Sequence, residues 1–272
     1  MPKFAIDYED LKPLGNTNEK ISAIGIGTWG IRDYKKAEDA LVYAIERGIN
    51  VIDTAESYGD GLAEELVGRV IKKVGRDRVF VITKLLPHRF TDEDTVIRAM
   101  TRSLQRLDIS YVDLVLIHWP NEYIPIETQI RYLETLAIKG FSRYIGVSNF
   151  KLKELEKAIH STSKFEIVLN QVKYSVIDKK VEKDLLKFMI EKRITLQAYT
   201  PIERGAVARN PILIGIANKY GKTPIQVALN YLISRPYVTA IPKSETIQHI
   251  EEFAGALGWR LSTNDIETLE AL

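Results

Sequence analysis

The sequence predicts an α/β fold in which parallel strands alternate with helices, and three observations lead to this class. Eight short apolar runs rich in Val and Ile recur along the 272 residues. A segment with helical period follows each run. The runs are continuously apolar rather than alternating, which is typical of parallel strands covered on both faces. Eight such strands predict a (β/α)8 barrel, the TIM barrel.

The predicted strands are short and end at or beside polar residues. They lie at residues 23–27, 49–53, 79–84, 112–118, 144–148, 167–171, 194–199 and 238–242. An additional hairpin is expected over residues 4–21, turning at "LGNTNEK" (14–20). It precedes the first barrel strand, so we expect it to close the bottom of the barrel.

Several helix ends carry capping signals. The first helix follows Asp33 and ends at Gly48, a residue suited to the left-handed position after a helix. The second is expected to start at Thr91 as N-cap. Another opens with Thr223 and Gln226, which form a capping box around a proline.

A last helix is expected after Ser262, with Asp265 in its first turn. Residues 151–157 and a helix over residues 181–191 have the pattern of solvated amphipathic surfaces. The apolar positions expected to face inward on the first, second and last helices are, in order, Ala37, Ala40, Leu41, Ala44 and Ile45; Val96, Ile97, Met100, Leu104 and Leu107; and Ile266, Leu269 and Leu272.

Composition narrows the functional classes. With 45% hydrophobic residues and no Pro, Gly or Ser linker, residues 1–272 are expected to form a single domain. The net charge of +2 is spread without a basic stripe, which argues against nucleic acid as a partner. The absence of cysteine excludes disulfides, thiolate zinc sites and cysteine nucleophiles.

The first fourteen residues carry several charges, which argues against a signal peptide, and no apolar stretch reaches the 18 residues of a membrane span. We therefore expect a cytoplasmic protein with no membrane partner. We also expect it to be a monomer.

Polar side chains close nearly every predicted strand. The carboxyl ends of parallel barrel strands open on one face, where barrel enzymes carry their active sites. Each polar residue could instead start a loop or cap a helix, but their recurrence favours a site. The strand-end residues are Asp53, Lys84, His118, Ser148, Asn149, Gln171, Tyr199, Lys243 and Ser244.

The residue types at these ends restrict the chemistry. Only His118 of the four histidines ends a strand, so no metal site is predicted. No phosphate-binding Walker loop and no G-x-S-x-G elbow occurs. A Schiff-base mechanism at Lys84 remains open, because burial lowers the pKa of a lysine.

A tyrosine five residues beyond Asp53 suggests a second chemistry. The phenol of Tyr58 could protonate an alkoxide, and an ammonium at Lys84 would bring its pKa nearer to neutral pH. Asp53 would keep Lys84 charged, while a neutral His118 could donate to a substrate oxygen. These four residues together predict carbonyl reduction.

Eight motifs resemble those of the aldo-keto reductases, in that family's order and over the whole chain. They are "GIGTW" (25–29), "DTAESYG" (53–59), "ITK" (82–84), "LIHWP" (116–120), "GVSNF" (146–150), "NQV" (170–172), "YTPIERG" (199–205) and "IPKS" (241–244). The resemblance implies a TIM barrel that reduces aldehydes and ketones to alcohols with NADPH, or alternatively NADH.

The resemblance also implies roles for individual residues. Tyr58 matches the general acid, Lys84 and Asp53 the pair that tunes it, and His118 the group that orients the carbonyl. The substrate pocket would be lined by Trp29, Tyr58, His118 and Trp119. The cofactor would be bound by Gly27, Thr28, Trp29, Asp53, Ser148, Asn149, Gln171, Tyr199, Thr200, Pro201, Ile202, Gly205, Ile241, Lys243, Ser244, His249 and Glu252.

Within that set, Ser148, Asn149 and Gln171 match the residues that hold the carboxamide of the cofactor. Tyr199 matches the ring on which the nicotinamide stacks. The loop over residues 200–205 would close over the pyrophosphate. Lys243 and Ser244 would meet the adenosine ribose or its 2′-phosphate.

Two positions depart from the family pattern. His249 stands where many members have an arginine that grips the 2′-phosphate, and imidazole lacks the guanidinium fork. Phe253 stands where an Asn often meets the adenine. We therefore expect NADPH as cofactor, with reduced discrimination against NADH. Because the chain ends soon after the last helix, we also expect a shallow cleft that accepts small activated carbonyls.

Two alternative interpretations remain. "GIGTWG" (25–30) matches the G-x-G-x-x-G fingerprint of the open dinucleotide-binding fold, although Trp29 is bulky for its turn. Some barrels similar to this one instead serve as regulatory subunits of potassium channels that bind cofactor and react slowly.

Overall fold

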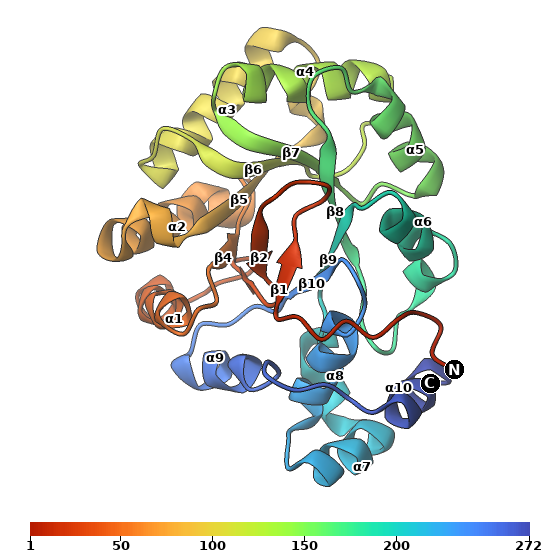
Figure 1. Cartoon of the computed structure of the whole chain (residues 1–272). Coiled ribbons are helices and arrows are strands. Elements are labelled where there is room, and N and C mark those ends of the chain that lie inside the picture. The colour runs from red at the N-terminus through yellow and green to blue at the C-terminus, as the bar shows by residue number, and fades with distance from the viewer.

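Eight parallel strands form a barrel in the computed structural model, which describes residues 1–272 (Figure 1). Each strand pairs with the next along the chain, from β3 to β10. Bridges between Ile24 and Ala240 and between Gly27 and Lys243 join the first strand to the last. The predicted (β/α)8 barrel is therefore confirmed. The open dinucleotide-binding sheet is wrong, because Gly25 and Gly27 belong to the closing edge of this barrel.

The observed strands overlap all eight predicted ones. Their bounds are β3 (Ile26–Gly27), β4 (Val51–Asp53), β5 (Phe80–Leu85), β6 (Val112–Ile117), β7 (Ser142–Ser148), β8 (Ile167–Lys173), β9 (Thr195–Tyr199) and β10 (Val238–Ile241). His118 lies one residue beyond β6, and β8 continues two residues past Gln171. Both changes leave the polar residues at the carboxyl ends.

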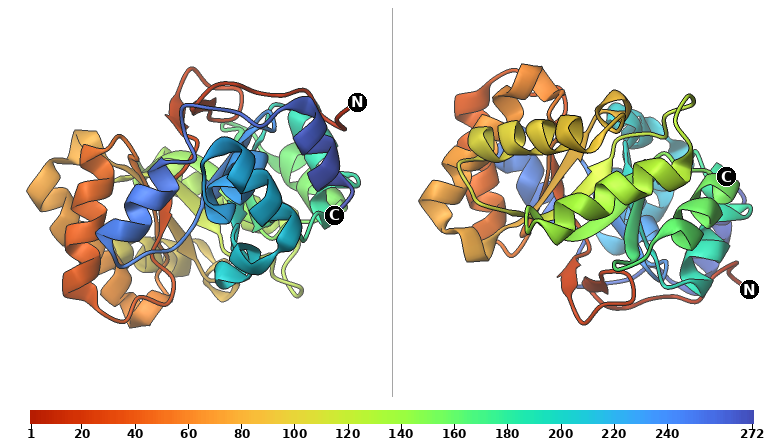
Figure 2. Two further views of the ribbon diagram at one scale, coloured as in Figure 1. Left: turned by 90° about the horizontal axis from the view of Figure 1, so that it is seen from below. Right: turned by 90° about the horizontal axis from the view of Figure 1, so that it is seen from above.

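Helices surround the barrel (Figure 2). They are α1 (Tyr34–Glu46), α2 (Leu62–Val74), α3 (Glu93–Leu107), α4 (Ile126–Ile138), α5 (Leu152–Ser161), α6 (Leu185–Glu191), α7 (Pro211–Tyr220), α8 (Pro224–Ile233), α9 (Ile247–Ala254) and α10 (Thr263–Glu270). The predicted start of α1 after Asp33 and the capping box of Thr223 and Gln226 on α8 are both confirmed, and the Asp33 side chain caps α1.

Three helix predictions need correction. Asp92, not Thr91, caps α3, because its carboxylate accepts the Thr95 N–H at 2.8 Å and a carboxylate also suits the helix dipole. Leu272 lies beyond the end of α10 and is 36% exposed. The helix expected over residues 181–191 is divided into a 3₁₀ turn (Lys180–Glu182) and α6, since Asp184 starts a new helix by capping Leu185.

Side chains fill the barrel interior in a period of two along each strand. On β6, Leu114 and Leu116 point inward, and the next residue on that face is His118. On β5, Phe80 and Ile82 point inward, and the next is Lys84. The apolar interior thus changes to a polar mouth at the carboxyl end of each strand, which places these groups at one end of the barrel.

The N-terminal hairpin closes the opposite end, as predicted, but it is shorter. It comprises β1 (Leu11–Pro13) and β2 (Lys20–Ser22), and it places Leu14 and Ile21 against the apolar barrel interior. Gly15 in its turn has φ +56°, and a Cβ there would meet Val168 at 2.8 Å. The hairpin does not begin at Phe4, because residues before Asp10 make no strand pairing.

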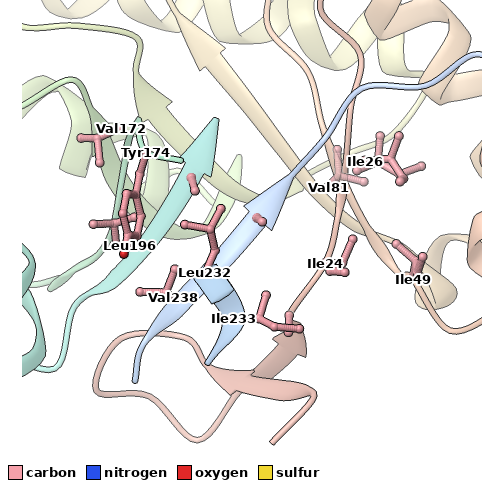
Figure 3. Packing of buried hydrophobic residues seen from close by; sticks show 14 of the residues in the cluster. Ile24, Ile26, Ile49, Val81, Val172, Tyr174, Leu196, Leu232, Ile233 and Val238 are labelled. Carbon is pink, nitrogen blue, oxygen red and sulfur yellow. The ribbon is translucent and has the colours of Figure 1, made fainter. Parts of the chain in front are cut away.

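A second, larger core lies between the barrel and the helices. Figure 3 shows part of it and labels Leu196 of β9, Leu232 and Ile233 of α8, and Val238 of β10, all of which belong to this core. These strand residues alternate with the inward-facing ones, so each strand is buried on both faces. This double burial explains the continuous apolar runs in the sequence.

Candidate active site

A cavity of about 1520 Å³ opens at the carboxyl ends of the strands. Strand ends and the loops that follow them supply most of its wall. Nearly every residue that the sequence predicts for the site lies on it: Gly27, Trp29, Asp53, Tyr58, His118, Trp119, Ser148, Asn149, Gln171, Tyr199, Thr200, Pro201, Ile202, Gly205, Ile241, Lys243, Ser244, His249 and Glu252.

Two predicted residues lie behind the cavity wall instead. Lys84 is fully buried and reaches the cavity only through the groups it contacts. Thr28 is also fully buried, and its hydroxyl donates to the backbone carbonyl of Asp53 at 3.0 Å. The side chain of Thr28 therefore holds the end of β4, and a contact between Thr28 and the cofactor stays a prediction.

Lys84 stands at the centre of a buried hydrogen-bond network. Its ammonium donates to Oδ2 of Asp53 at 2.7 Å, to the carbonyl of Thr54 at 2.8 Å and to the hydroxyl of Tyr58 at 3.2 Å. An ammonium has three hydrogens and cannot accept, so these contacts use all of its donors. Because Tyr58 accepts here, its own hydrogen is left to be donated elsewhere.

The turn after β4 brings Tyr58 to this network. Tyr58 begins a short 3₁₀ turn (Tyr58–Gly61), in which Gly59 has φ +57°. This left-handed backbone favours glycine at position 59, and a Cβ there would also displace the hydroxyl of Tyr34, which lies 2.1 Å away. The spacing of five residues between Asp53 and Tyr58 thus corresponds to a strand end followed by one tight turn.

Asp53 is held by two partners. Oδ2 accepts from Lys84, and Oδ1 accepts from Nε2 of Gln171 at 2.6 Å. Gln171 also donates to Oε1 of Gln197 at 2.7 Å, which fixes the orientation of its amide group. The amide oxygen of Gln171 is thereby directed away from Asp53.

His118 packs between two aromatic rings at the cavity wall. The centroid of its ring lies 5.6 Å from that of Tyr58, in an edge-to-face arrangement, and 4.5 Å from that of Trp119. Burial, with the Lys84 ammonium nearby, lowers the pKa of His118 to about 3. The imidazole is therefore neutral at neutral pH and retains one N–H donor.

The ionisation of the other groups follows from their surroundings. Burial alone would lower the pKa of Lys84, but the Asp53 carboxylate reverses this and raises it, so Lys84 remains protonated. Burial raises the pKa of Tyr58 above its ordinary value, and Lys84 offsets only part of that rise. The expected shift of the Tyr58 pKa toward neutral pH is therefore wrong, and the phenol is protonated at neutral pH.

A neighbouring part of the wall consists of amide and hydroxyl groups. Asn149, at φ +62°, donates to the carbonyl of His118 at 3.0 Å and to Oγ of Ser148 at 3.1 Å. The hydroxyl of Tyr199 donates to Oδ1 of Asn149 at 2.8 Å, which fixes the orientation of the tyrosine ring. A flat ring thus stands beside a set of neutral hydrogen-bonding groups.

The loop over residues 200–205 lines the cavity, and Arg204 in it was not among the predicted site residues. The guanidinium of Arg204 lies 5.5 Å from the centre of the Trp29 ring. Glu203 fastens the same loop on the other side, because it pairs with Lys173 at 3.2 Å and accepts from Ser175 at 2.8 Å. The loop is thereby tied to both flanks of the cavity.

The segment after β10 supplies the last part of the wall. Lys243 forms an ion pair with Glu245, and His249 stacks on Phe253 with ring centroids 6.3 Å apart. Sequence reasoning missed Arg32, Arg204, Glu245 and Thr246, which also line the cavity. Of these four residues, only Glu245 could have been identified from the sequence as a site residue, because it directly follows the "IPKS" motif (241–244).

No group of three or more His, Asp or Glu side chains is arranged to hold a metal ion. Each helix is too short or too polar to cross a lipid bilayer.

The chain is similar to known proteins over nearly its whole length. The model of the Aldo/keto reductase family matches residues 23–272. The chain is 32% identical over 259 residues to methylglyoxal reductase YeaE of Escherichia coli, covering 92% of this chain and 90% of that protein.

Two solved structures are also similar. A thermostable aldo-keto reductase, Tm1743, in complex with the inhibitor epalrestat is 40% identical with a TM-score of 0.90, covering 96% of this chain and 98% of that one. An aldo/keto reductase from Klebsiella pneumoniae in complex with NADP and acetate is 32% identical with a TM-score of 0.90, covering 97% and 95%.

Proposed function

Because the chain belongs to the aldo/keto reductase family, we propose that it reduces small aldehydes and ketones to alcohols with NADPH, using Tyr58 as the acid. The observation that carries the proposal is the hydrogen bond from Lys84 to Tyr58 at 3.2 Å. It leaves the phenol proton available to a group in the cavity. The relative named methylglyoxal reductase supports a small, activated carbonyl as substrate.

The cavity fits a nicotinamide dinucleotide by its shape and by its chemistry. It is large and extends from Tyr58 to the segment after β10. Its wall presents in turn neutral amides and hydroxyls, a flat tyrosine ring, an arginine-bearing loop and a Lys-Ser pair, which match a carboxamide, a nicotinamide ring, a pyrophosphate and a ribose. Bound NADPH supplies the hydride that reduces the carbonyl carbon.

Ser148, Asn149 and Gln171 would hold the carboxamide, and Tyr199 would stack on the ring. Arg204 and the backbone of residues 200–205 would cover the pyrophosphate, where a guanidinium suits phosphate oxygens. Trp29 and Trp119, which are 57% and 42% exposed, would form the walls of the substrate pocket. Large exposed aromatic rings at a cavity mouth are suited to covering an apolar part of a ligand.

The proton follows a defined route in this proposal. The carbonyl oxygen would lie between Tyr58 and His118, whose neutral imidazole donates a hydrogen bond without protonating it. As the carbonyl carbon gains the hydride, the oxygen takes the Tyr58 proton and the alcohol forms. Lys84, kept charged by Asp53, stabilises the phenolate left behind. The Asp53–Lys84 pair stays charged throughout, and the phenolate shares the Lys84 ammonium with the Asp53 carboxylate until Tyr58 is reprotonated.

The raised pKa of Lys84 argues against the Schiff-base alternative, because an ammonium is not a nucleophile. No contact in the structure favours a regulatory subunit over an enzyme.

The test is to measure NADPH and NADH oxidation by the purified protein across aldehydes, ketones and sugars. We expect turnover on glyoxal-type dicarbonyls at about 1 s⁻¹ or faster. Tight binding of NADPH without turnover on any carbonyl would contradict the enzymatic proposal and favour the regulatory alternative. Failure to bind either nucleotide would contradict the whole assignment.

A further inference from the structure

Glu245 occupies a position in the cavity that the proposed reaction does not require. It lies in the segment Lys243–Thr246 between β10 and α9, beside the expected ribose site. Its carboxylate forms the ion pair with Lys243. The same carboxylate accepts the backbone N–H of Arg32 at 3.1 Å and that of Asp33 at 3.2 Å.

These contacts fix the carboxylate in place. Two backbone amides at the start of α1 hold it from one side, and its side chain is only 16% exposed. Burial would raise the pKa of Glu245, but the Lys243 ammonium and the two amides lower it overall, so the group is ionised at neutral pH. An anion thus stands permanently beside Lys243.

The charges at this end of the cavity balance. Lys243 and Arg32 supply two positive charges, while Glu245 and Glu252 supply two negative ones. The helix α9 that follows has no Lys or Arg in its sequence, IQHIEEFA. His249 on that helix stacks on Phe253, which favours a flat base between or beside the rings rather than an anion.

A 2′-phosphate carries nearly two negative charges at neutral pH and needs a surplus of cations. Here the only lysine of the segment, Lys243, is already paired with Glu245. The Glu245 carboxylate would also repel the phosphate, because both are negative. A ribose 2′-hydroxyl, in contrast, can donate to a carboxylate, as in dinucleotide sites that carry an acidic residue at the ribose. The segment therefore has a cation, Lys243, for a ribose with a 2′-phosphate and an acceptor, Glu245, for a ribose with a 2′-hydroxyl.

We propose that Glu245 determines cofactor specificity by opposing the 2′-phosphate and accepting the 2′-hydroxyl, so that the protein binds NADPH and NADH with similar affinity. The inference rests on the proposed function, since it names the cofactor preference of that same cavity. Lys243 contacts a 2′-phosphate when one is present, and Glu245 weakens that contact.

The experiment isolates the adenosine end of the site. Calorimetry measures binding of adenosine 2′,5′-bisphosphate and of adenosine 5′-monophosphate to the ligand-free protein, to Glu245→Gln and to Glu251→Gln. Glu251 lies on α9 and pairs with Arg47 at 3.0 Å, outside the cavity wall. It is therefore a matched control, because it removes the same charge without freeing Lys243.

We expect the parent to bind the two ligands within about tenfold of each other. In Glu245→Gln the bisphosphate should bind roughly tenfold tighter, while the monophosphate stays unchanged or weakens. Glu251→Gln should change neither affinity by more than about twofold. An unchanged ratio in folded Glu245→Gln would overturn the inference.

The parent alone provides a second test that needs no variant. A preference for the bisphosphate above about a hundredfold would overturn the proposal even if Glu245→Gln failed to fold. Fluorescence titration of the parent with NADPH and NADH tests the role of Glu245 separately from the proposed function. Binding of both with a large preference for NADPH rejects only the role of Glu245, whereas binding of neither rejects the proposed function.

Discussion

Lys84 Nζ lies 2.7 Å from Oδ2 of Asp53, and neither side chain reaches solvent appreciably, with exposed fractions of 0% and 3%. Removing either partner would leave the other as an unpaired charge in the protein interior. Because Tyr58 accepts a hydrogen bond from the same ammonium, the ion pair links the stability of the barrel mouth to the proposed chemistry.

Replacing Tyr58 by Phe should remove the proton donor while keeping the ring against His118. We expect kcat/KM for carbonyl reduction to fall by about 10²–10⁴-fold. The dissociation constant for NADPH should stay within about twofold, because the phenol is not expected to contact the cofactor's phosphates. Steady-state kinetics with a fluorescence titration measures both, and an undiminished rate would refute the acid role of Tyr58.

The buried ion pair should show strong energetic coupling. Lys84→Met leaves the Asp53 carboxylate unpaired and should lower the free energy of unfolding by about 3–5 kcal/mol. The double variant Asp53→Asn with Lys84→Met should recover much of that loss, yet remain inactive. Urea denaturation of the parent and the three variants gives the double-mutant cycle. Additive losses would mean that the two charges do not stabilise one another.

The pH profile of reduction should reflect the raised pKa of Tyr58. The acid is active when protonated, so activity persists below its pKa and is lost as the pH rises through it. Since burial places that pKa above 10.0, kcat should stay flat between about pH 6 and 9. A descending limb centred near pH 7 would contradict the environment described for Tyr58. Alcohol oxidation, which needs the phenolate, should accelerate with pH over the same range.

His118 should make folding stability depend on pH. Its pKa falls from 6.5 in the unfolded chain to about 3 in the folded protein. Between these two pH values the unfolded chain binds a proton at His118 and the folded protein does not. Stability from the neutral imidazole is therefore present above pH 6.5 and is lost as the pH falls toward 3.

Relative to His118→Gln, the parent should lose up to about 1.4 kcal/mol per pH unit in this window. Denaturant melts at several pH values test this, and parallel curves for parent and variant would show that His118 does not titrate as described.

Arg204 should contribute to cofactor binding through its charge. It lines the cavity, stacks on Trp29 and forms no ion pair. Arg204→Gln should raise the dissociation constant for NADPH by about threefold and reduce its dependence on salt. Arg209→Gln is the control, because Arg209 is exposed at the end of the 3₁₀ segment Glu203–Arg209 that contains Arg204, but does not line the cavity. If both substitutions weakened NADPH binding equally, the effect would come from the net positive charge of the protein and not from the position of Arg204 in the cavity.

The location of the strands was largely determined by the sequence alone. Residues such as those of β6 are buried on both faces, and that burial requires a continuous apolar run that can be read without coordinates. Local caps were less certain. Asp92 and Thr91 are neighbours with similar capping ability, and only the observed backbone shows which one accepts from Thr95.

For the candidate site, the sequence predicted which residue types gather at the barrel mouth, because side-chain alternation carries Leu114 and Leu116 on to His118. Only the tertiary structure decided the net pKa of Tyr58, the position of Thr28 behind the wall and the pairing of Glu245 with Lys243. These depend on distances between segments far apart in the chain and on how much water each group retains. Periodicity along a single strand contains neither quantity.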